Sequence, residues 1–334
     1  MQVNTDYTKE RKASGLTSLL NFVSKWGTVI AIVLLFIFFT ISMPQFIDAS
    51  NLLTILRSIS IVTVIAIGLT IALTVNGLDL SIGSAATFSN SLIVSFFVWY
   101  SMPTFVSLAL ALVITLVVAA INAILIVKVK IPDMLATLST MFIFEGVAMT
   151  YTGGGSISEG MPRLDGTPTN GTLPDLFEKI GQAPYIIIIM LVVVAIVHVF
   201  LNHTKHGRYL YVVGGNMEAA RLSGISVNRY RTLAYVLSTF FASLGGIMIA
   251  ARIGSAQINA GAGYLMPAVA AAFIGSSFGG SGKPNAIGTF IGAILVGVLE
   301  NGLVMMSVPY YSLNIVKGSV LALALASTYF RKKN

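Results

Sequence analysis

Carboxylic acids that stand within or between long apolar stretches are the residues of this sequence best placed to do chemistry. Asp79, Glu145 and Glu300 are of this kind. At the centre of a membrane helix an ionisable group costs about 2.5–3.5 kcal/mol, so Glu145 and Glu300, which lie inside apolar runs, each need a partner or a water-filled cavity. The sequence offers three basic candidates as partners: Arg57, Arg252 and Lys317. For Glu145 and Glu300 two roles stay open, an interhelical ion pair or a carboxylate that couples transport to protons.

Four polar residues are predicted to line a path through the membrane: Asn76, Asp79, Asn122 and Asn301. A neutral solute needs no fixed countercharge, and weak, sparse contacts allow it to leave again. Each residue also has a structural interpretation. Asp79 can cap the helix that follows it, and an asparagine between helices can hold them together by a hydrogen bond.

The sequence shows no clear motif for catalysis or for binding a cofactor. No nucleophile with a nearby base, no pair of catalytic carboxylates and no metal-binding cluster stands out, and cysteine is absent. The glycine-rich stretch at 275–284 resembles a phosphate-binding loop, but Ser277 replaces the first glycine and Pro284 the residue that would hold magnesium. We therefore predict a chain that is not an enzyme and binds no metal or cofactor itself.

The composition is that of a membrane protein. Only 10% of the 334 residues are charged and 56% are hydrophobic, with a mean hydropathy of +0.88. A soluble domain carries about 25% charged residues, so this chain has too few charges to cover a soluble core. The net charge of +8 does not indicate nucleic acid, because the basic residues lie between the apolar runs.

Ten apolar runs predict an all-α polytopic protein with about ten transmembrane helices. They lie at 27–47, 52–76, 82–100, 104–127, 134–152, 185–203, 232–251, 264–280, 285–305 and 312–330. With the N-terminus inside, 15 of the 20 Lys and Arg residues fall on the cytoplasmic side, as the positive-inside rule requires. Both termini are therefore predicted to be cytoplasmic, and the protein is predicted to reside in a cell membrane.

The predicted organisation is one transmembrane domain, 26–331, between cytoplasmic tails at 1–25 and 331–334. An irregular outer loop, 153–184, carries glycines, prolines and acids, with a short helix expected at 174–180. An inner loop, 204–231, carries five basic residues.

Within the inner loop a short helix is expected at 216–223. Asn216 is its predicted N-cap, and the order of Glu218 and Arg221 suits the helix dipole. The remaining candidates are small residues that would let the helix seat in a groove of a partner: Ala219, Ala220 and Gly224. A membrane protein that offers such a helix to the cytoplasm is expected to be driven from there.

Two similar segments in the two halves of the chain suggest an inverted repeat. Asn122 begins a segment at the end of the fourth run and is followed ten residues later by Pro132. Asn301 begins a similar segment at the end of the ninth run and is followed eight residues later by Pro309. The two segments lie on opposite sides of the membrane in the predicted topology. Inverted repeats of this kind are common in transporters.

Three segments in this order resemble the ribose/xylose-type permeases of bacterial ABC importers. They are the turn 77–83 (Gly-Leu-Asp-Leu-Ser-Ile-Gly), the tract 207–231 and the glycine-rich region 275–302. The resemblance covers most of residues 50–330. It implies a dimer with a second permease copy or a paralogue, a cytoplasmic ATP-binding subunit that binds ATP and magnesium, and an extracytoplasmic sugar-binding protein.

The resemblance also implies that 216–226 is the coupling helix that docks into the ATPase. One departure lies in the segment 263–271, where many relatives have an acidic residue and this chain has Met266 and Pro267. Any role of that carboxylate cannot be carried over. The sugar stays open: a pentose, a hexose, a sugar alcohol and autoinducer-2 all fit.

Two other classes compete with the importer. A secondary transporter would use an ion gradient, with Glu145 or Glu300 titrating, and would not need a docking helix. A membrane enzyme, for example one acting on lipid-linked sugars, would need a catalytic constellation, and none stands out in the sequence. The short helix in 204–231 therefore favours the ATP-driven importer.

Overall fold

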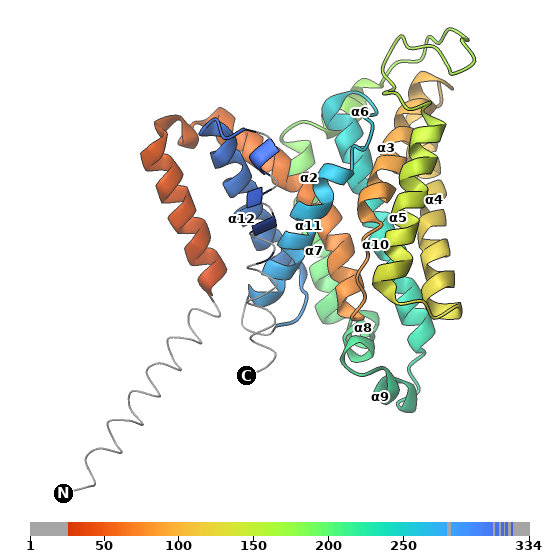
Figure 1. The fold of residues 1–334 in the computed structure, drawn as a ribbon, viewed down its shortest axis with the longest axis vertical. Coiled ribbons are helices and arrows are strands. Elements are labelled where there is room, and N and C mark those ends of the chain that lie inside the picture. Colours follow the sequence, from red (N-terminus) through yellow and green to blue (C-terminus); the bar gives the residue numbers. More distant parts are fainter. Residues whose placement is uncertain are drawn as a thin grey trace, which may run out of the picture.

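The computed structural model describes residues 26–278, 282–309, 311–313, 315–316, 318–319 and 322, and in that part of the chain it is helical (Figure 1). In lipid only helices and closed barrels satisfy every backbone hydrogen bond, which is why the apolar runs fold as helices. The helices in the first half are Trp26–Ser42, η1 (Pro44–Ile47), α2 (Ala49–Thr74), α3 (Ile82–Val98), α4 (Thr104–Ala123), the π-helical η2 (Ile124–Lys128) and α5 (Asp133–Tyr151). The second half contains α6 (Asp175–Ile180), α7 (Tyr185–His203), α8 (Lys205–Gly215), α9 (Met217–Leu222), α10 (Val227–Ile253), α11 (Ala262–Ser277) and α12 (Ala286–Met305).

Nine of the ten predicted runs coincide with a helix. Six helices are long and apolar enough to cross a membrane: α2, α4 with η2, α5, α7, α10 and α12. Trp26–Ser42, α3 and α11 are apolar but shorter. The tenth run, 312–330, and the predicted tails 1–25 and 331–334 lie mostly or wholly outside the described residues, so the count of ten stays a prediction.

Local sequence signals explain where several helices begin. Proline stands directly before α4, α5, α6 and α7, at positions where a missing backbone N–H leaves no helical bond unmade. The Asn285 side chain caps α12 by accepting a hydrogen bond from the Gly288 N–H at 2.6 Å. The short helix expected at 174–180 is confirmed as α6.

A central pair of helices, α2 and α10, organises the bundle and makes the most extensive helix–helix contact. α3 lies along α10, and α11 lies along α2. Every residue of α3 is buried, whereas α4, α5 and α7 expose most of their apolar surface, as lipid-facing helices do. Glycine allows the closest approach, since a Cβ at Gly246 in α10 would stand 2.1 Å from the Ala86 carbonyl oxygen of α3.

Two breaks in the helices meet inside the bundle. Residues 75–81 separate α2 from α3, and residues 254–261 separate α10 from α11. The second break runs along α3, where the Gln257 N–H donates to Asn90 Oδ1 (3.1 Å) and the Gly261 N–H to Thr87 Oγ1 (2.9 Å). Non-helical backbone at this depth is tolerated where protein or water surrounds it.

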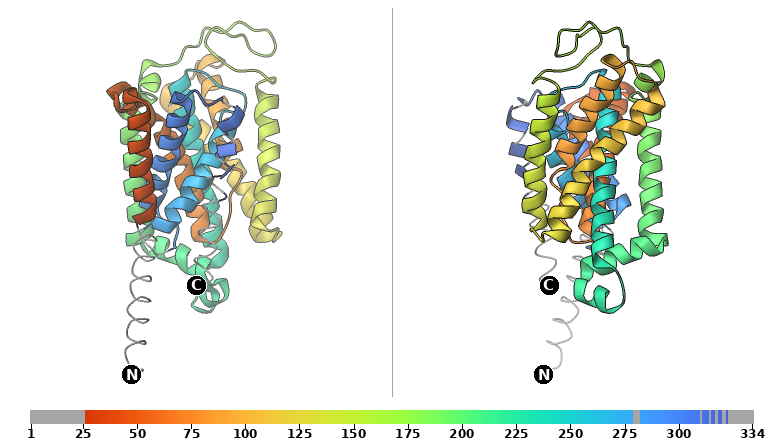
Figure 2. Two further views of the ribbon diagram at one scale, coloured as in Figure 1. Left: turned by 60° about the vertical axis from the view of Figure 1, so that its left-hand side comes forward. Right: turned by 90° about the vertical axis from the view of Figure 1, so that its right-hand side faces the viewer.

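The two predicted loops lie at opposite ends of the molecule. Figures 1 and 2 show α8 and α9 beyond one end of the bundle and the 153–184 loop at the other. The sequence did not predict α8, because its glycines suggested irregular backbone. Gly207 and Gly214 instead let α8 pack tightly: a Cβ at these positions would stand 2.2 Å from the Phe200 oxygen and 2.0 Å from the Thr74 oxygen.

Candidate functional site

The short helix α9 has the cap and charges that the sequence predicted. Asn216 Oδ1 accepts hydrogen bonds from the backbone N–H groups of Glu218 and Ala219, both at 3.0 Å, so its assignment as N-cap is confirmed. Arg221 pairs with Glu218 on the exposed surface, where an ion pair adds little stability. These contacts fix α9 as a defined helix that solvent or a partner can reach.

Not all of the α9 candidates face outward. Asn216, Glu218, Ala219, Arg221 and Gly224 are exposed. Ala220 is fully buried among the residues of its own chain, so the prediction that it faces a groove of the partner is wrong. Its side chain lies on the inner face of α9, where it fixes the helix to the bundle.

Two features of the α9 region have a clear geometric role. Gly224 has a φ of +75°, a left-handed conformation that favours glycine and ends the helix. Leu222, which the sequence analysis did not single out, is 89% exposed at the last position of α9. A leucine at the end of a polar helix outside the apolar runs is the signal that would have indicated it.

Asp79 and Asn122 come together in a buried set of hydrogen bonds, the Asp79 network (Asp79, Ser81, Asn122, Thr137 and Thr140). Ser81 donates to Asp79 Oδ1 from its N–H (3.0 Å) and from its hydroxyl (2.6 Å). Asn122 donates to Ser81 Oγ (2.8 Å) and accepts from Thr140 Oγ1 (2.6 Å). Thr137 donates to the Leu78 carbonyl at 3.0 Å. The network therefore ties the first helix break to α4 and α5.

The capping prediction for Asp79 needs correction. The N-cap of α3 is Ser81, and no side chain caps that helix. Asp79 lies two residues earlier and binds Ser81 itself, so its side chain stabilises the turn rather than the helix N–H groups. Its second oxygen, Oδ2, and the nearby Ser238 hydroxyl are buried with no hydrogen-bond partner in the described part of the chain.

A second set of polar residues, the Asp133 cluster (Asp133, Arg231 and Tyr235), lies beside the network. Asp133 at the start of α5 forms an ion pair with Arg231 of α10 and accepts a hydrogen bond from the Tyr235 hydroxyl at 2.5 Å. Gly77 leaves room for this contact, since a Cβ there would stand 2.5 Å from that hydroxyl. The sequence analysis counted Arg231 only as a loop charge, because its partner is 98 residues away.

Asn76 lies apart from the network, in a cavity of about 220 Å³ next to α8. Tyr211 lines the same cavity and donates from its hydroxyl to the Pro284 carbonyl at 2.6 Å. Burial raises the pKa of Tyr211 to about 12, so this hydroxyl keeps its proton and its hydrogen bond near neutral pH. Asn76 therefore lies at the α8 end of the bundle and not beside Asn122.

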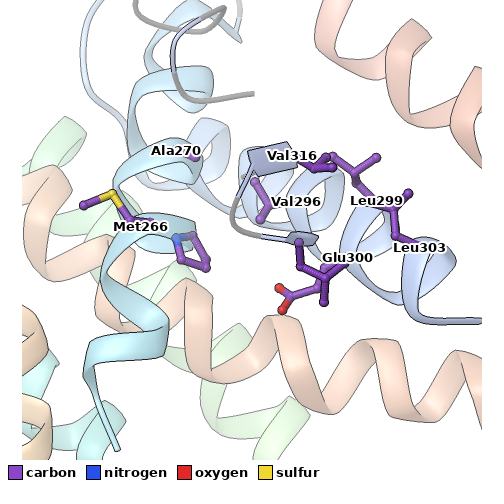
Figure 3. A pocket seen from close by; sticks show the side chains of 9 residues that line it. Met266, Ala270, Val296, Leu299, Glu300, Leu303 and Val316 are labelled. Atoms are coloured by element: carbon purple, nitrogen blue, oxygen red, sulfur yellow. The ribbon is translucent and has the colours of Figure 1, made fainter. Parts of the chain in front are cut away.

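Asn301 links two helices. Its amide donates to Asn51 Oδ1 of α2 at 3.0 Å, which fits the structural interpretation of an interhelical hydrogen bond. Glu300, one residue earlier, lines a small apolar pocket in which Met266 extends away from it (Figure 3). Met266 is 45% exposed on α11, so the departure from the family pattern falls on a surface position.

Glu145 lies on a cavity of about 210 Å³, the Glu145 cavity (Gly83, Ser84, Thr87, Met141, Glu145, Ala262 and Leu265). α3, α5 and α11 form its walls at the place where the two helix breaks meet. Glu145 has no hydrogen bond or ion pair with any residue that the structure describes. Of its candidate partners, neither Arg57 nor Arg252 pairs with Glu145 in the part of the chain that the structure describes, and Lys317 lies outside the described residues.

The geometry is that of a transport protein built around sparse polar contacts. The described residues contain no group of three His, Cys, Asp or Glu that could hold a metal ion. Polar groups instead gather at two helix breaks within an apolar bundle, as they do in membrane transporters. The fold and these sites therefore define a multi-pass membrane permease.

The chain belongs to the family described as branched-chain amino acid transport system / permease component, whose model matches residues 51–325. It is 33% identical over 318 residues to the ribose import permease protein RbsC of Haemophilus influenzae, covering 93% of this chain and 95% of that protein. It is 34% identical to RbsC of Escherichia coli K12, covering 89% and 91%. The galactose/methyl galactoside import permease protein MglC of Escherichia coli K12 is 30% identical, covering 95% and 98%. No solved structure matches the chain.

Proposed function

We propose that this chain is the membrane-spanning permease subunit of an ATP-driven importer that carries a monosaccharide or related polyol into the cytoplasm. The observation that carries the proposal is the similarity over 93% of the chain to a ribose import permease. The exposed helix α9 supports it, because a subunit that cannot hydrolyse ATP needs a surface through which an ATPase can move it. A second permease copy or paralogue and an extracytoplasmic binding protein complete the assembly.

The family description and the relatives point to different solutes, and a transport assay separates them. The description of the family names branched-chain amino acid transport, whereas the similar relatives include import permeases for ribose and for galactose. The chain should be produced with its ATPase and binding protein, and uptake of ribose, galactose, xylose and leucine measured. ATP-dependent uptake of a sugar supports the proposal, and uptake of leucine alone contradicts it.

A secondary transporter is the second candidate, and the observation that favours it is the Glu145 carboxylate, which has no partner among the described residues. The two mechanisms differ in their source of energy. In the importer, uptake continues when the proton gradient is collapsed and ATP is maintained. Transport by this chain alone in proteoliposomes, driven by an ion gradient, would establish the secondary transporter instead.

The proposed topology has ten spans with both termini in the cytoplasm. The crossed pairing of α3 with α10 and of α11 with α2 supports the inverted repeat that underlies it. Because the chain lacks cysteine, single cysteines report the side of the membrane directly.

A cysteine at Asp165, in the outer loop, should react with an impermeant thiol reagent in cells without an outer barrier. A cysteine at Asn216 should not react. Leu222 is a better second site, because replacing it leaves the α9 cap intact. The reverse labelling pattern would contradict this orientation.

A further inference from the structure

We propose that the Glu145 cavity binds the transported solute during its passage, and that Glu145 recognises it by accepting hydrogen bonds from neighbouring hydroxyl groups. The inference rests on the proposed importer function and names the residue through which the membrane subunit would contact its solute. The class of solute that such a site favours is a neutral polyhydroxylated molecule.

The cavity has room for a solute and a suitable lining. Its volume of about 210 Å³ is far above the 10–15 Å³ that one water molecule needs. Most of the lining is apolar, including the side chains of Met141 and Leu265, and the polar lining residues are few. Small-molecule sites combine apolar walls with a small number of placed polar groups in this way.

Glu145 is the polar group of the lining whose hydrogen-bonding capacity is unused. The Ser84 hydroxyl donates to the Ser81 carbonyl (3.0 Å). The Thr87 hydroxyl donates to the Gly83 carbonyl (3.1 Å) and accepts from the Gly261 N–H. Both oxygens of Glu145 are without a partner among the residues described. A ligand entering the cavity would therefore meet one strong acceptor and two occupied hydroxyls.

The chemistry of a lone carboxylate selects among solutes. An ionised carboxylate accepts hydrogen bonds at both oxygens and donates none, so two adjacent hydroxyls of one sugar can bind it together. An anionic solute would be repelled at the same place. No cation among the described residues pairs with Glu145, so it would hold a neutral solute through hydrogen bonds alone, and such contacts are weak enough to release it.

Variants of Glu145 in the assembled importer test the assignment by transport. Uptake of ribose, galactose and xylose should be measured with the ATPase and binding protein present. Glu145→Leu removes the acceptor and should lower uptake of the transported sugar about tenfold, equivalent to ~1.4 kcal/mol. Glu145→Gln keeps one acceptor oxygen and should give an intermediate rate. Glu178→Gln, an exposed carboxylate on α6 outside the cavity, is the matched control and should behave like the wild type.

A labelling experiment tests binding independently of transport. In this cysteine-free chain Met141→Cys places a thiol on the cavity wall, and Met134→Cys places one on the exposed surface of α5 away from it. Ribose, galactose or xylose, whichever is transported, should slow the reaction of the first thiol with a small alkylating reagent and leave the second unchanged. This measurement remains decisive if Glu145→Leu fails to assemble.

The outcomes separate the two proposals. If the wild-type complex transports none of the three sugars, the proposed function fails. If it transports one of them while Glu145→Leu keeps normal uptake and the Met141→Cys thiol is not protected, the function stands and the Glu145 assignment is overturned. Reduced uptake in Glu145→Leu together with protection at Met141→Cys supports the assignment.

Discussion

The Asp79 network and the Glu145 cavity use polar residues in opposite ways. In the network, Asp79, Ser81 and Asn122 are fully buried and joined by short hydrogen bonds. In the cavity, Glu145 is half-buried and has no partner in the described chain. A buried network whose members bond to one another holds one structure, even though Asp79 Oδ2 has no partner in the described chain, whereas an unpartnered group at a cavity is available to a ligand.

This difference assigns a structural role to the Asp79 network and solute recognition to the Glu145 cavity. The network and the adjoining Asp133 cluster connect α4, α5 and α10, and α10 begins directly after α9. Arg231 and Asp133 therefore link the start of α10 to the start of α5, beside Gly77 of the first helix break. Variants that remove hydrogen-bond or ion-pair partners within the network test whether its role is structural.

The largest effect on stability is expected for Asp133→Ala. It leaves Arg231, whose side chain is only 16% exposed, without its carboxylate, at a cost of about 3 kcal/mol. Thermal unfolding of the purified protein in detergent measures this loss. Asp133→Ala combined with Arg231→Met should recover part of it, because no unpaired charge remains. An unchanged unfolding temperature in Asp133→Ala would show that the cluster is not structural.

Gly224→Trp should uncouple ATP hydrolysis from uptake while the protein stays in the membrane. The side chain would project from the exposed surface beside α9 and obstruct docking. Gly224→Ala is the control, because any side chain is strained at a φ of +75° but alanine adds almost no bulk. The ratio of sugar transported to ATP hydrolysed is the measurement. Normal transport in the tryptophan variant would contradict the docking assignment.

Asn122→Ala and Asn301→Ala compare two asparagines at corresponding positions of the suggested inverted repeat. Asn122 has two interhelical or inter-segment hydrogen bonds and Asn301 has one. At about 0.6 kcal/mol for each such interaction, Asn122→Ala should lose close to twice as much unfolding free energy as Asn301→Ala. Both should reduce transport only partially. Equal losses in the two variants would mean that the Asp79 network adds nothing beyond a single bond.

Asp79→Asn is expected to have the smallest effect on transport. Asparagine Oδ1 can accept both hydrogen bonds from Ser81, and its Nδ2 can donate to the partnerless Ser238 hydroxyl. Since neutral acceptors bind more weakly than charged ones, the stability cost should stay within about 1 kcal/mol, with transport retained. Complete loss of uptake at normal protein level would show that the charge of Asp79 is used in transport.

The helices and their ends follow closely from local sequence. Nine apolar runs are helices because hydropathy and hydrogen bonding within a helix depend on residues near one another. The Asn216 cap was predictable for the same reason, since the N–H groups it binds are two and three residues away. The missed helix α8 shows the limit of this reasoning, because Gly207 and Gly214 serve packing there and do not interrupt the helix.

The polar sites depended on the tertiary structure. Asn122 meets Ser81 across 41 residues, and Arg231 meets Asp133 across 98, distances over which no local pattern specifies a partner. The sequence identified Glu145 as a carboxylate that needed a partner or a cavity, and only the packing of α3, α5 and α11 decided for the cavity. Sequence alone determined which segments are apolar helices, whereas the fold determined which polar groups bond to one another and that Glu145 faces a cavity.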